Sequence, residues 1–231
     1  MPAEIDTRQK QYEYYRDSLL TFAETGRIMP QTDRQTDRQT DRQTDRQLIR
    51  LIQYVFGYVN VCLSDVVQIK NGKDYKAFNA GAYPVYGSGG IMTYIDGYCY
   101  DKPSVLIPRK GSLSNLFYVE KPFWNVDTVF YTEIDESLVI PKFLYYILQT
   151  KHLNKLNKAG GVPSLTQSIL NKLVISIPSL KEQKQIVLTL DRFDQLCNDI
   201  SEGLPAEIEA RQKQYEYYRD KLLTFKPLKE N

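Results

Sequence analysis

The chain has 231 residues and is 42% hydrophobic, so it exceeds one average domain and can bury a sizeable core. Its 30 basic residues are nearly balanced by 28 acidic ones, and a net charge of +2 means that nucleic-acid binding would need a local basic face. Three scattered cysteines without a Cys-x-x-Cys pair, and a single histidine, leave almost no material for a zinc site or a disulfide scaffold.

The two ends of the chain carry the same element. Residues 2–22 and 205–225 differ at only three of 21 positions, which indicates a recent duplication or a fragment of a longer chain that carried the element twice. In residues 186–225 apolar and aromatic side chains alternate at steps of three and four, the spacing of a heptad seam. We expect an extended helical spacer with a kink near Gly203 and Pro205; two amphipathic helices packed on the core are the alternative. The predicted seam for association is Ile5, Tyr12, Tyr15, Leu19, Phe22, Ile186, Leu190, Phe193, Ile200, Ile208, Tyr215, Tyr218, Leu222 and Phe225.

Residues 32–47 are four copies of Thr-Asp-Arg-Gln. Because the tract has no apolar residue, it cannot bury a face, and it is predicted to be a solvated linker or an exposed helical extension. The codons ACA-GAC-AGA-CAG encode this unit and are also three tandem copies of ACAG. We therefore hypothesise a slippage-prone tetranucleotide tract in the gene, which would switch the reading frame; a protein-level repeat selected for charge balance is the alternative.

From Val61 to Pro178 the pattern changes to short apolar runs and turns, which is typical of an α+β domain. Strands are predicted at 104–107, 126–131 and 173–177, and a helix at 141–154. Glycine-rich loops are predicted at 83–90 and 160–166.

Several motifs in this region resemble a known family. YPVYGSGG at 83–90, VLIPRKGS at 105–112, WNVDTVF at 124–130, and ISIPSLKEQKQIV at 175–187 with the following LDRFDQL are similar to the target-recognition domain of type I restriction–modification specificity subunits. The tail from Gly203 to Phe225 resembles the helical region of that family. The resemblance covers about residues 58 to 225, most of the chain.

The resemblance implies an α+β fold, with one mixed α/β target-recognition domain and long helices that form an antiparallel coiled-coil spacer. The implied division is an N-terminal copy of the helical region at 1–25, the repeat linker at 26–50, the recognition domain at 51–180 and a helical dimerisation region at 181–231. Family members usually carry two recognition domains, so this sequence resembles a half-length form. The implied partners are double-stranded DNA, a modification subunit that uses S-adenosylmethionine, an ATP-driven restriction subunit, and a second copy or a different half-subunit.

Reading a DNA sequence requires side chains at the groove edges and further contacts to phosphates. Four segments offer both kinds of side chain, on donor-rich or glycine-hinged turns. Their candidate DNA-binding residues are Lys70, Asn71, Lys73 and Lys76; Tyr86, Ser88 and Gly89; Arg109, Lys110, Ser112 and Asn115; and Ser164, Thr166 and Gln167. The alternatives are that Arg109 and Lys110 form a plain solvated turn, and that Tyr86 and Trp124 belong to the core.

Signatures of catalysis are missing from the sequence: it has no glycine-rich cofactor fingerprint, no Asn-Pro-Pro-aromatic methyltransferase motif, no Walker loop and no metal-ligand cluster. We therefore expect no catalytic residue, metal or cofactor, and predict that His152 lies at the surface. The polar N-terminus and the short apolar runs predict a soluble, cytoplasmic protein without membrane contact. The alternatives are a coiled-coil scaffold that does not bind DNA, and an inactive frame-shifted fragment or recombination cassette.

Overall fold

The computed structural model describes residues 10, 12–14, 16–17, 20, 38–156, 164–192, 194 and 213–214. The chain divides into two compact units, one formed by residues 1–16 and 189–231 and the other by residues 17–188. Every described residue of the first unit is helical, and Tyr12 and Leu190 are buried. The described residues of the repeated segments are thus helical as expected, whereas their association in a coiled coil stays a prediction.

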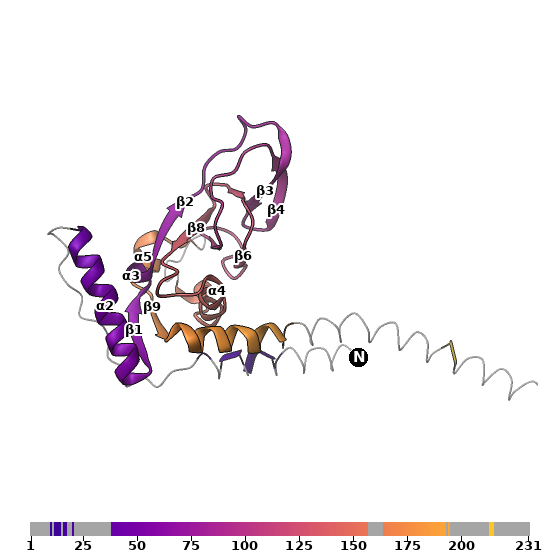
Figure 1. Ribbon diagram of the computed structural model, residues 1–231. Helices are drawn as coiled ribbons and strands as arrows, with labels where there is room; N and C mark the ends of the chain where they lie inside the picture. Colours follow the sequence, from indigo (N-terminus) through magenta and orange to yellow (C-terminus); the bar gives the residue numbers. More distant parts are fainter. Residues whose placement is uncertain are drawn as a thin grey trace, which may run out of the picture. The chain divides into compact units, whose positions relative to one another are not determined.

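The strands described in the second unit form three separate sheets (Figure 1). The strand order is β1 (Tyr58–Cys62) and β9 (Val174–Pro178) in the first; β2 (Val67–Asn71), β8 (Val129–Ile134), β5 (Ser104–Pro108) and β6 (Phe117–Val119) in the second; and β4 (Gly90–Ile95), β3 (Ala80–Gly87) and β7 (Trp124–Asn125) in the third. Neighbouring strands are antiparallel except β3 and β7, which are parallel. Together with the helices, these sheets confirm the mixed α/β class.

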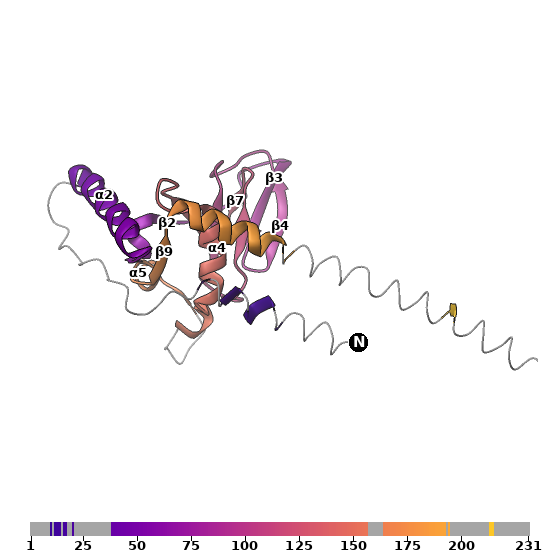
Figure 2. The same cartoon turned by 60° about the horizontal axis from the view of Figure 1, so that its bottom comes forward.

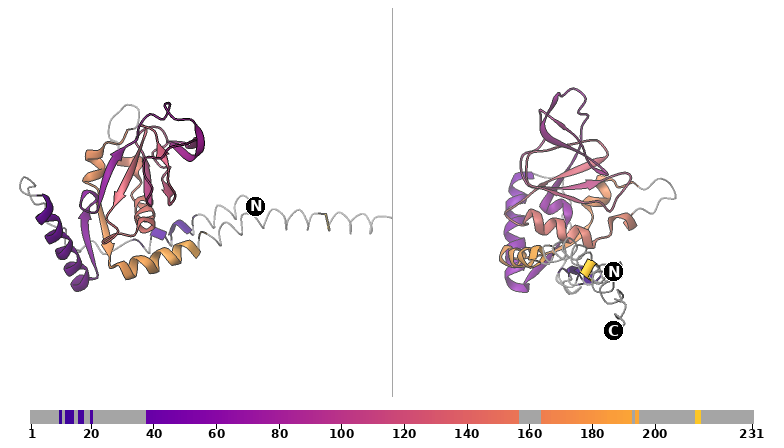
Figure 3. Two further views of the ribbon diagram at one scale, coloured as in Figure 1. Left: turned by 45° about the horizontal axis from the view of Figure 1, so that its top comes forward. Right: turned by 90° about the vertical axis from the view of Figure 1, so that its right-hand side faces the viewer.

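Some of the described helices begin at recognised start signals. From Arg38 to residue 192 the described helices are α2 (Arg38–Phe56), α3 (Leu63–Val66), α4 (Pro141–Thr150), the 3-10 helix η1 (Leu153–Leu156), α5 (Gln167–Asn171) and residues 180–192. Pro141 lies in the first turn of α4, where its missing N–H is not needed. The last helix starts with a capping box, because the Ser179 N–H donates to the Glu182 carboxylate at 3.3 Å and the Glu182 N–H donates to the Ser179 hydroxyl at 3.4 Å. Figure 3 shows the start of this helix beside α4.

The core of the second unit is centred on β5, which is buried along its whole length between β8 and β6. Helix α4 contacts both β5 and β6 and buries Phe143, Leu144 and Ile147. Polar groups inside this core are paired: the Val105 N–H donates to Thr132 Oγ1 at 2.9 Å, and the Ser104 hydroxyl donates to the Thr132 carbonyl at 2.8 Å.

The strand and helix predictions are right in type and shifted at their ends. β5 confirms the strand expected at 104–107, and β9 lies one residue later than the one expected at 173–177. The strand expected at 126–131 starts only at Val129, because the three residues before it form a turn closed by a 3.0 Å hydrogen bond from the Val129 N–H to the Val126 carbonyl. The helix expected over 141–154 ends at Thr150, and His152 is exposed, with a φ of 45°, at the turn into η1.

The prediction of a loop at 83–90 is wrong for most of that segment. Val85 is fully buried and pairs with both β4 and β7, so residues up to Gly87 belong to β3. The glycines serve the hairpin turn between β3 and β4 instead, and Gly90 has a φ of 120°, which favours glycine. The hairpin lies at the far end of the unit from α2 (Figures 1 and 2).

Helix α2 contains the last part of the repeat tract and continues to Phe56. The border predicted at residue 50 therefore falls inside a helix, and the described part of the tract, residues 38–47, agrees with the helical-extension alternative. None of the helices in the described ranges combines the length and the hydropathy that a membrane span needs.

Candidate DNA interface

The position of β8 brings together two of the four candidate segments. Phe130 on β8 pairs with Asn71 of β2 on one side and with Ile107 of β5 on the other. Because both neighbours are antiparallel to β8, β2 and β5 run in the same direction and end at the same edge of the sheet, one on each side of β8. The segments that begin at Lys70 and at Arg109 therefore leave the sheet at the same edge, one strand apart.

The segment before α5 contacts both of these chain ends. The Leu165 N–H donates to the Arg109 carbonyl at 2.9 Å, and Lys110 and Ser164 form an isolated β-bridge. The Gln167 side-chain amide donates to the Ile69 carbonyl at 3.2 Å and approaches Asn71 Oδ1 at 3.5 Å. The segment before α5 thus contacts both the first candidate segment, which lies 98 residues earlier in the sequence at Ile69, and the third.

The β3–β4 turn completes the group. Gly111 has a φ of 79°, and a Cβ placed on it would lie 3.2 Å from Ser88 Oγ, so the two turns are in close contact. The residues 69–76, 86–90, 109–115 and 164–167 form one surface, which we name the four-loop face. The structure therefore brings together all four segments predicted from sequence.

Arg109 is the most constrained side chain of the four-loop face. Its guanidinium carbon lies 5.3 Å from the centre of the Phe130 ring, a cation–π arrangement. Its backbone N–H donates to the Thr128 carbonyl at 2.9 Å, and its carbonyl accepts from Leu165. Its Nε is buried and has no hydrogen-bond partner among the described residues. Stacking and backbone bonds thus fix a cation whose polar groups are not fully satisfied within the chain.

The lysines of the face differ in whether they already form an ion pair. Lys73, Lys76 and Lys110 are exposed. Lys70 instead pairs with Glu133 of β8 at 3.5 Å, and the Asp74 carboxylate accepts from the Lys76 backbone N–H at 3.2 Å. The exposed lysines and the stacked Arg109 therefore supply the local basic character that the nearly neutral chain lacks as a whole.

The phenols of Tyr86 and Tyr131 and the thiol of Cys99, in and near the face, have raised pKa values. Burial raises the pKa of the Tyr86 hydroxyl, with a smaller contribution from Tyr94, and burial is also the main cause of the raised pKa of the Cys99 thiol. For Tyr131, burial first and the Glu133 charge second raise the pKa to about 12. Within the ranges that the structure describes, no cluster of three or more His, Cys, Asp or Glu side chains could hold a metal ion.

Several predicted residues have a structural task in the fold. Tyr86 packs against Phe117 and Phe123, and the Trp124 indole donates to the Lys73 carbonyl at 2.9 Å from a buried position, which agrees with the core alternative for both aromatic rings. The Thr166 hydroxyl caps α5 by accepting from the Ile169 N–H at 3.3 Å. The remaining polar candidates Asn71, Ser112 and Asn115 are exposed, as is Gly89.

Of the predicted association seam, Tyr12 and Leu190 are buried and Ile186 is half-buried. The others lie outside the described residues: Ile5, Tyr15, Leu19, Phe22, Phe193, Ile200, Ile208, Tyr215, Tyr218, Leu222 and Phe225. The seam as a whole therefore stays a prediction.

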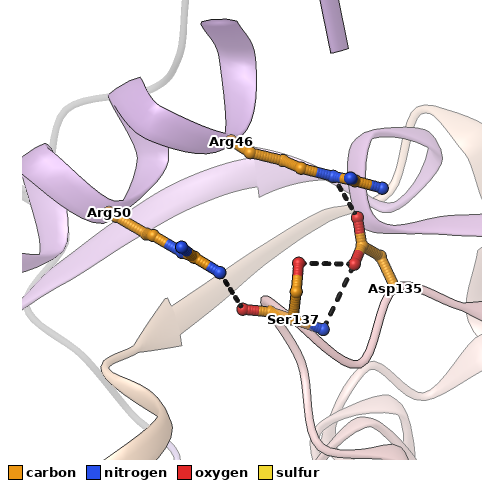
Figure 4. Close-up of polar contacts among 4 residues, drawn as sticks. All are labelled: Arg46, Arg50, Asp135 and Ser137. Carbon is orange, nitrogen blue, oxygen red and sulfur yellow. Dashed lines mark hydrogen bonds and ion pairs between the residues drawn. The ribbon is translucent and has the colours of Figure 1, made fainter. Parts of the chain in front are cut away.

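Sequence reasoning missed a second set of polar contacts, made by α2 (Figure 4). Arg46, in the last copy of the repeat, forms an ion pair with Asp135 at 2.6 Å, and Arg50 donates to the Ser137 carbonyl at 3.3 Å. Gln53, one turn further along, donates to the carbonyls of Ile177 and Pro178. The steps of four and three between these residues place them on one helix face, which was the available signal.

Comparison with known proteins defines the class to which this fold and face belong. The family model described as "Type I restriction modification DNA specificity domain" matches residues 57–210. A putative type I restriction enzyme specificity subunit of Haemophilus influenzae is 33% identical over 94% of this chain and 53% of its own length. The EcoR124I/EcoR124II specificity subunit of Escherichia coli is 30% identical over 97% of this chain and 55% of its own length.

Solved structures agree on the fold. The S subunit of a type I restriction–modification system from M. genitalium has a TM-score of 0.63 at 19% identity, with 92% of this chain and 54% of that chain covered. The HsdS subunit from Thermoanaerobacter tengcongensis has a TM-score of 0.52 at 15% identity, over 87% and 52%. The chain belongs to the family of type I restriction–modification specificity subunits, and it spans about half the length of these relatives.

The contact between two turns of the four-loop face can be tested with Gly111→Ala. An alanine at this position would have to keep a positive φ, which L residues rarely adopt, and its methyl group would contact Ser88. We therefore expect the free energy of unfolding to fall by about 1–2 kcal/mol. Gly89→Ala is the matched control, since a Cβ there meets nothing within 4 Å, and we expect a change within about 0.5 kcal/mol. Urea denaturation of both variants measures the difference; equal losses of stability would contradict the close approach of the two turns.

Proposed function

We propose that this chain is the non-catalytic, sequence-specific DNA-binding subunit of a type I restriction–modification complex, and that it binds one half of a bipartite duplex target. The observation that carries the proposal is the convergence of four polar loops around the stacked Arg109, in a chain that belongs to the specificity-subunit family. Fixed side chains on short loops suit sequence recognition, because less conformational entropy is lost when they bind.

The four-loop face offers the two kinds of contact that duplex DNA requires. Lys73, Lys76 and Lys110 neutralise phosphates in this proposal, and Arg109 donates to a phosphate or a base edge. The exposed amide of Asn115 matches the donor and acceptor pair at an adenine edge. Asn71 and Gln167, whose amides approach each other, contribute the remaining Asn71 donor and Gln167 acceptor. The proposed contact set is completed by Lys70, Tyr86, Ser88, Gly89, Ser112, Ser164 and Thr166.

In this proposal the flanking helical regions hold the recognition domain at a fixed distance from a second recognition domain. Residues 1–25 and 181–231 form the proposed antiparallel coiled-coil arms, and residues 26–56, which include α2, connect the first arm to the recognition domain. Two copies related by a two-fold axis would bind an interrupted palindrome, whereas pairing with a different half-subunit would give an asymmetric site. The length match to about half of each full-length relative supports a need for a second half.

Methylation and cleavage belong to partner subunits in this proposal. The modification subunit uses S-adenosylmethionine, and the restriction subunit carries out ATP-driven cleavage. This chain recognises the target sequence and needs no cofactor of its own. Co-purification with the modification subunit separates this role from a scaffold and from an inactive fragment.

DNA binding through phosphates should depend steeply on salt. We expect the logarithm of the affinity for duplex DNA to fall linearly with the logarithm of the salt concentration, and Lys110→Ala to reduce that slope by about one. Lys184→Ala, an exposed lysine outside the four-loop face, is the control and should leave the slope unchanged. Fluorescence anisotropy with the full chain and its modification subunit measures both; a salt-independent affinity would favour the scaffold instead.

Association of two halves can be measured directly. Static light scattering at micromolar concentration should give twice the mass of one chain for a homodimer, because the arms bury their seams against each other. If the chain pairs with a different half-subunit, the doubled mass should appear only when that partner is added. A strict monomer alone, with the modification subunit and with the different half-subunit would contradict both forms of the proposal.

The repeat tract supports a further part of the proposal, that production of this subunit is switched by slippage in the gene. We expect the DNA of residues 32–47 to be an uninterrupted run of ACAG, so that three units add four residues and one unit shifts the frame. Sequencing the gene from single colonies should show different unit numbers. A tract of mixed synonymous codons would contradict the slippage hypothesis.

A further inference from the structure

The hairpin of β3 and β4 carries an exposed apolar strip next to the four-loop face. Ile91 and Met92 follow directly after the turn that contributes to the face, and Tyr94 lies two residues further along β4. Their side chains are 49%, 58% and 51% exposed. A single exposed apolar residue is common, whereas several large ones close together mark a surface that binds another molecule. We name Ile91, Met92 and Tyr94 the hairpin strip.

Strand pairing connects the hairpin strip to the four-loop face. Ile91 lies opposite Tyr86, which belongs to the face, and directly opposite residues share one side of a sheet. Tyr94 is also within electrostatic reach of Tyr86, because it contributes, after burial, to the raised pKa of the Tyr86 hydroxyl. The hairpin strip is therefore continuous with the four-loop face.

A β-bulge determines where Met92 lies. The register of β3 and β4 shifts after Val85, so Met92 has no partner residue on β3. Bulges of this kind redirect side chains. A Cβ placed on Gly87 would lie 2.6 Å from Met92 Sδ, which means that the Met92 side chain lies over the glycine. The missing side chain at Gly87 thus leaves room for an exposed thioether at the end of the hairpin.

The hairpin has no charged side chain, although cations surround it on the face. Residues 77–95 contain no Asp, Glu, Lys, Arg or His, whereas Lys73, Lys76 and Lys110 on the neighbouring loops are exposed lysines. An uncharged apolar strip does not neutralise phosphates, so its binding partner on DNA has to be an apolar group. The major groove offers one such group, the C5 methyl of thymine.

We propose that Ile91 and Met92 are specificity-determining residues that contact the C5 methyl group of a thymine in the major groove. This inference rests on the proposed function, and it adds the recognition of one A·T pair to the polar contacts of the four-loop face. Among the four bases only thymine presents a methyl group at the groove edge, so an apolar contact distinguishes it from cytosine at the same place.

The test uses the full chain in complex with its modification subunit. The target sequence is first identified by mapping methylated adenines across the host genome. In synthetic duplexes of that target, each thymine is then replaced in turn by deoxyuridine, which lacks only the methyl group, and fluorescence anisotropy measures the affinity for each duplex.

The variants are Ile91→Ala and Met92→Ala, alone and combined. Leu51→Ala is the matched control, because Leu51 is as exposed as Met92, at 58%, and lies on α2 at the far end of the unit from the hairpin (Figure 1). Gly87→Ala is a further variant, since its methyl group would push the Met92 side chain aside without removing it. Thermal melting of each complex checks that the variants fold.

For the wild type, deoxyuridine at one position should weaken binding by about fourfold, as expected for one lost methyl contact. The combined variant should bind the unmodified duplex more weakly by at least that factor, and the same deoxyuridine should then cost less than about twofold, because the contact is already lost. Gly87→Ala should reduce the deoxyuridine effect in part, and Leu51→Ala should leave it unchanged. The salt slope should stay at the wild-type value in all of these variants, unlike in Lys110→Ala.

A full deoxyuridine effect in both the combined variant and Gly87→Ala would overturn the inference, as would a wild type that binds every deoxyuridine duplex like the target. Loss of the modification subunit from the purified combined variant would assign the hairpin strip to a protein partner and overturn it as well. If the wild-type complex shows no sequence preference among duplexes, the proposed function fails instead.

Discussion

The central place of β8 is the constraint on which the rest of the candidate interface depends. Its register places Phe130 between the ends of β2 and β5, so the two segments that follow these strands start at the same edge of the sheet. The same ring then supports the Arg109 guanidinium. Buried Thr132 strengthens the contact between β8 and β5, because its side chain bonds the Val105 backbone where the strand-to-strand ladder has ended. A change in this register would separate the loops and remove the support for Arg109.

Local charge explains how a nearly neutral chain can present a basic surface. Exposed lysines lie on two of the four loops, and the half-buried phenols of Tyr86 and Tyr131 and thiol of Cys99 add no charge, because their pKa values are raised. The ion pair between Lys70 and Glu133 removes one further cation from the free set. The positive charge available to a phosphate therefore depends on which lysines are already paired. It cannot be inferred from the total count of basic residues.

The second unit combines two regions with different demands. At the four-loop face, Arg109 Nε has no hydrogen-bond partner among the described residues, which suits a surface that binds another molecule. At the start of the helix 180–192, the buried Gln183 amide donates two hydrogen bonds and accepts one, which suits a rigid connection.

The sequence by itself determined the repeated helical element, the family resemblance, the strand at β5 and the four segments of the candidate face. Each of these depends on residues that are close together in the chain: periodicity, glycine and proline positions, or short motifs. Only the tertiary structure decided that most of residues 83–90 belong to a hairpin strand, that Arg109 stacks on Phe130, and that the last repeat copy is bound to the domain through Arg46. It alone paired Gln53 with Pro178, 125 positions later. The physical reason is that a hydrogen bond or ring contact depends on distance in space, and local patterns say little about which distant segments a fold brings together.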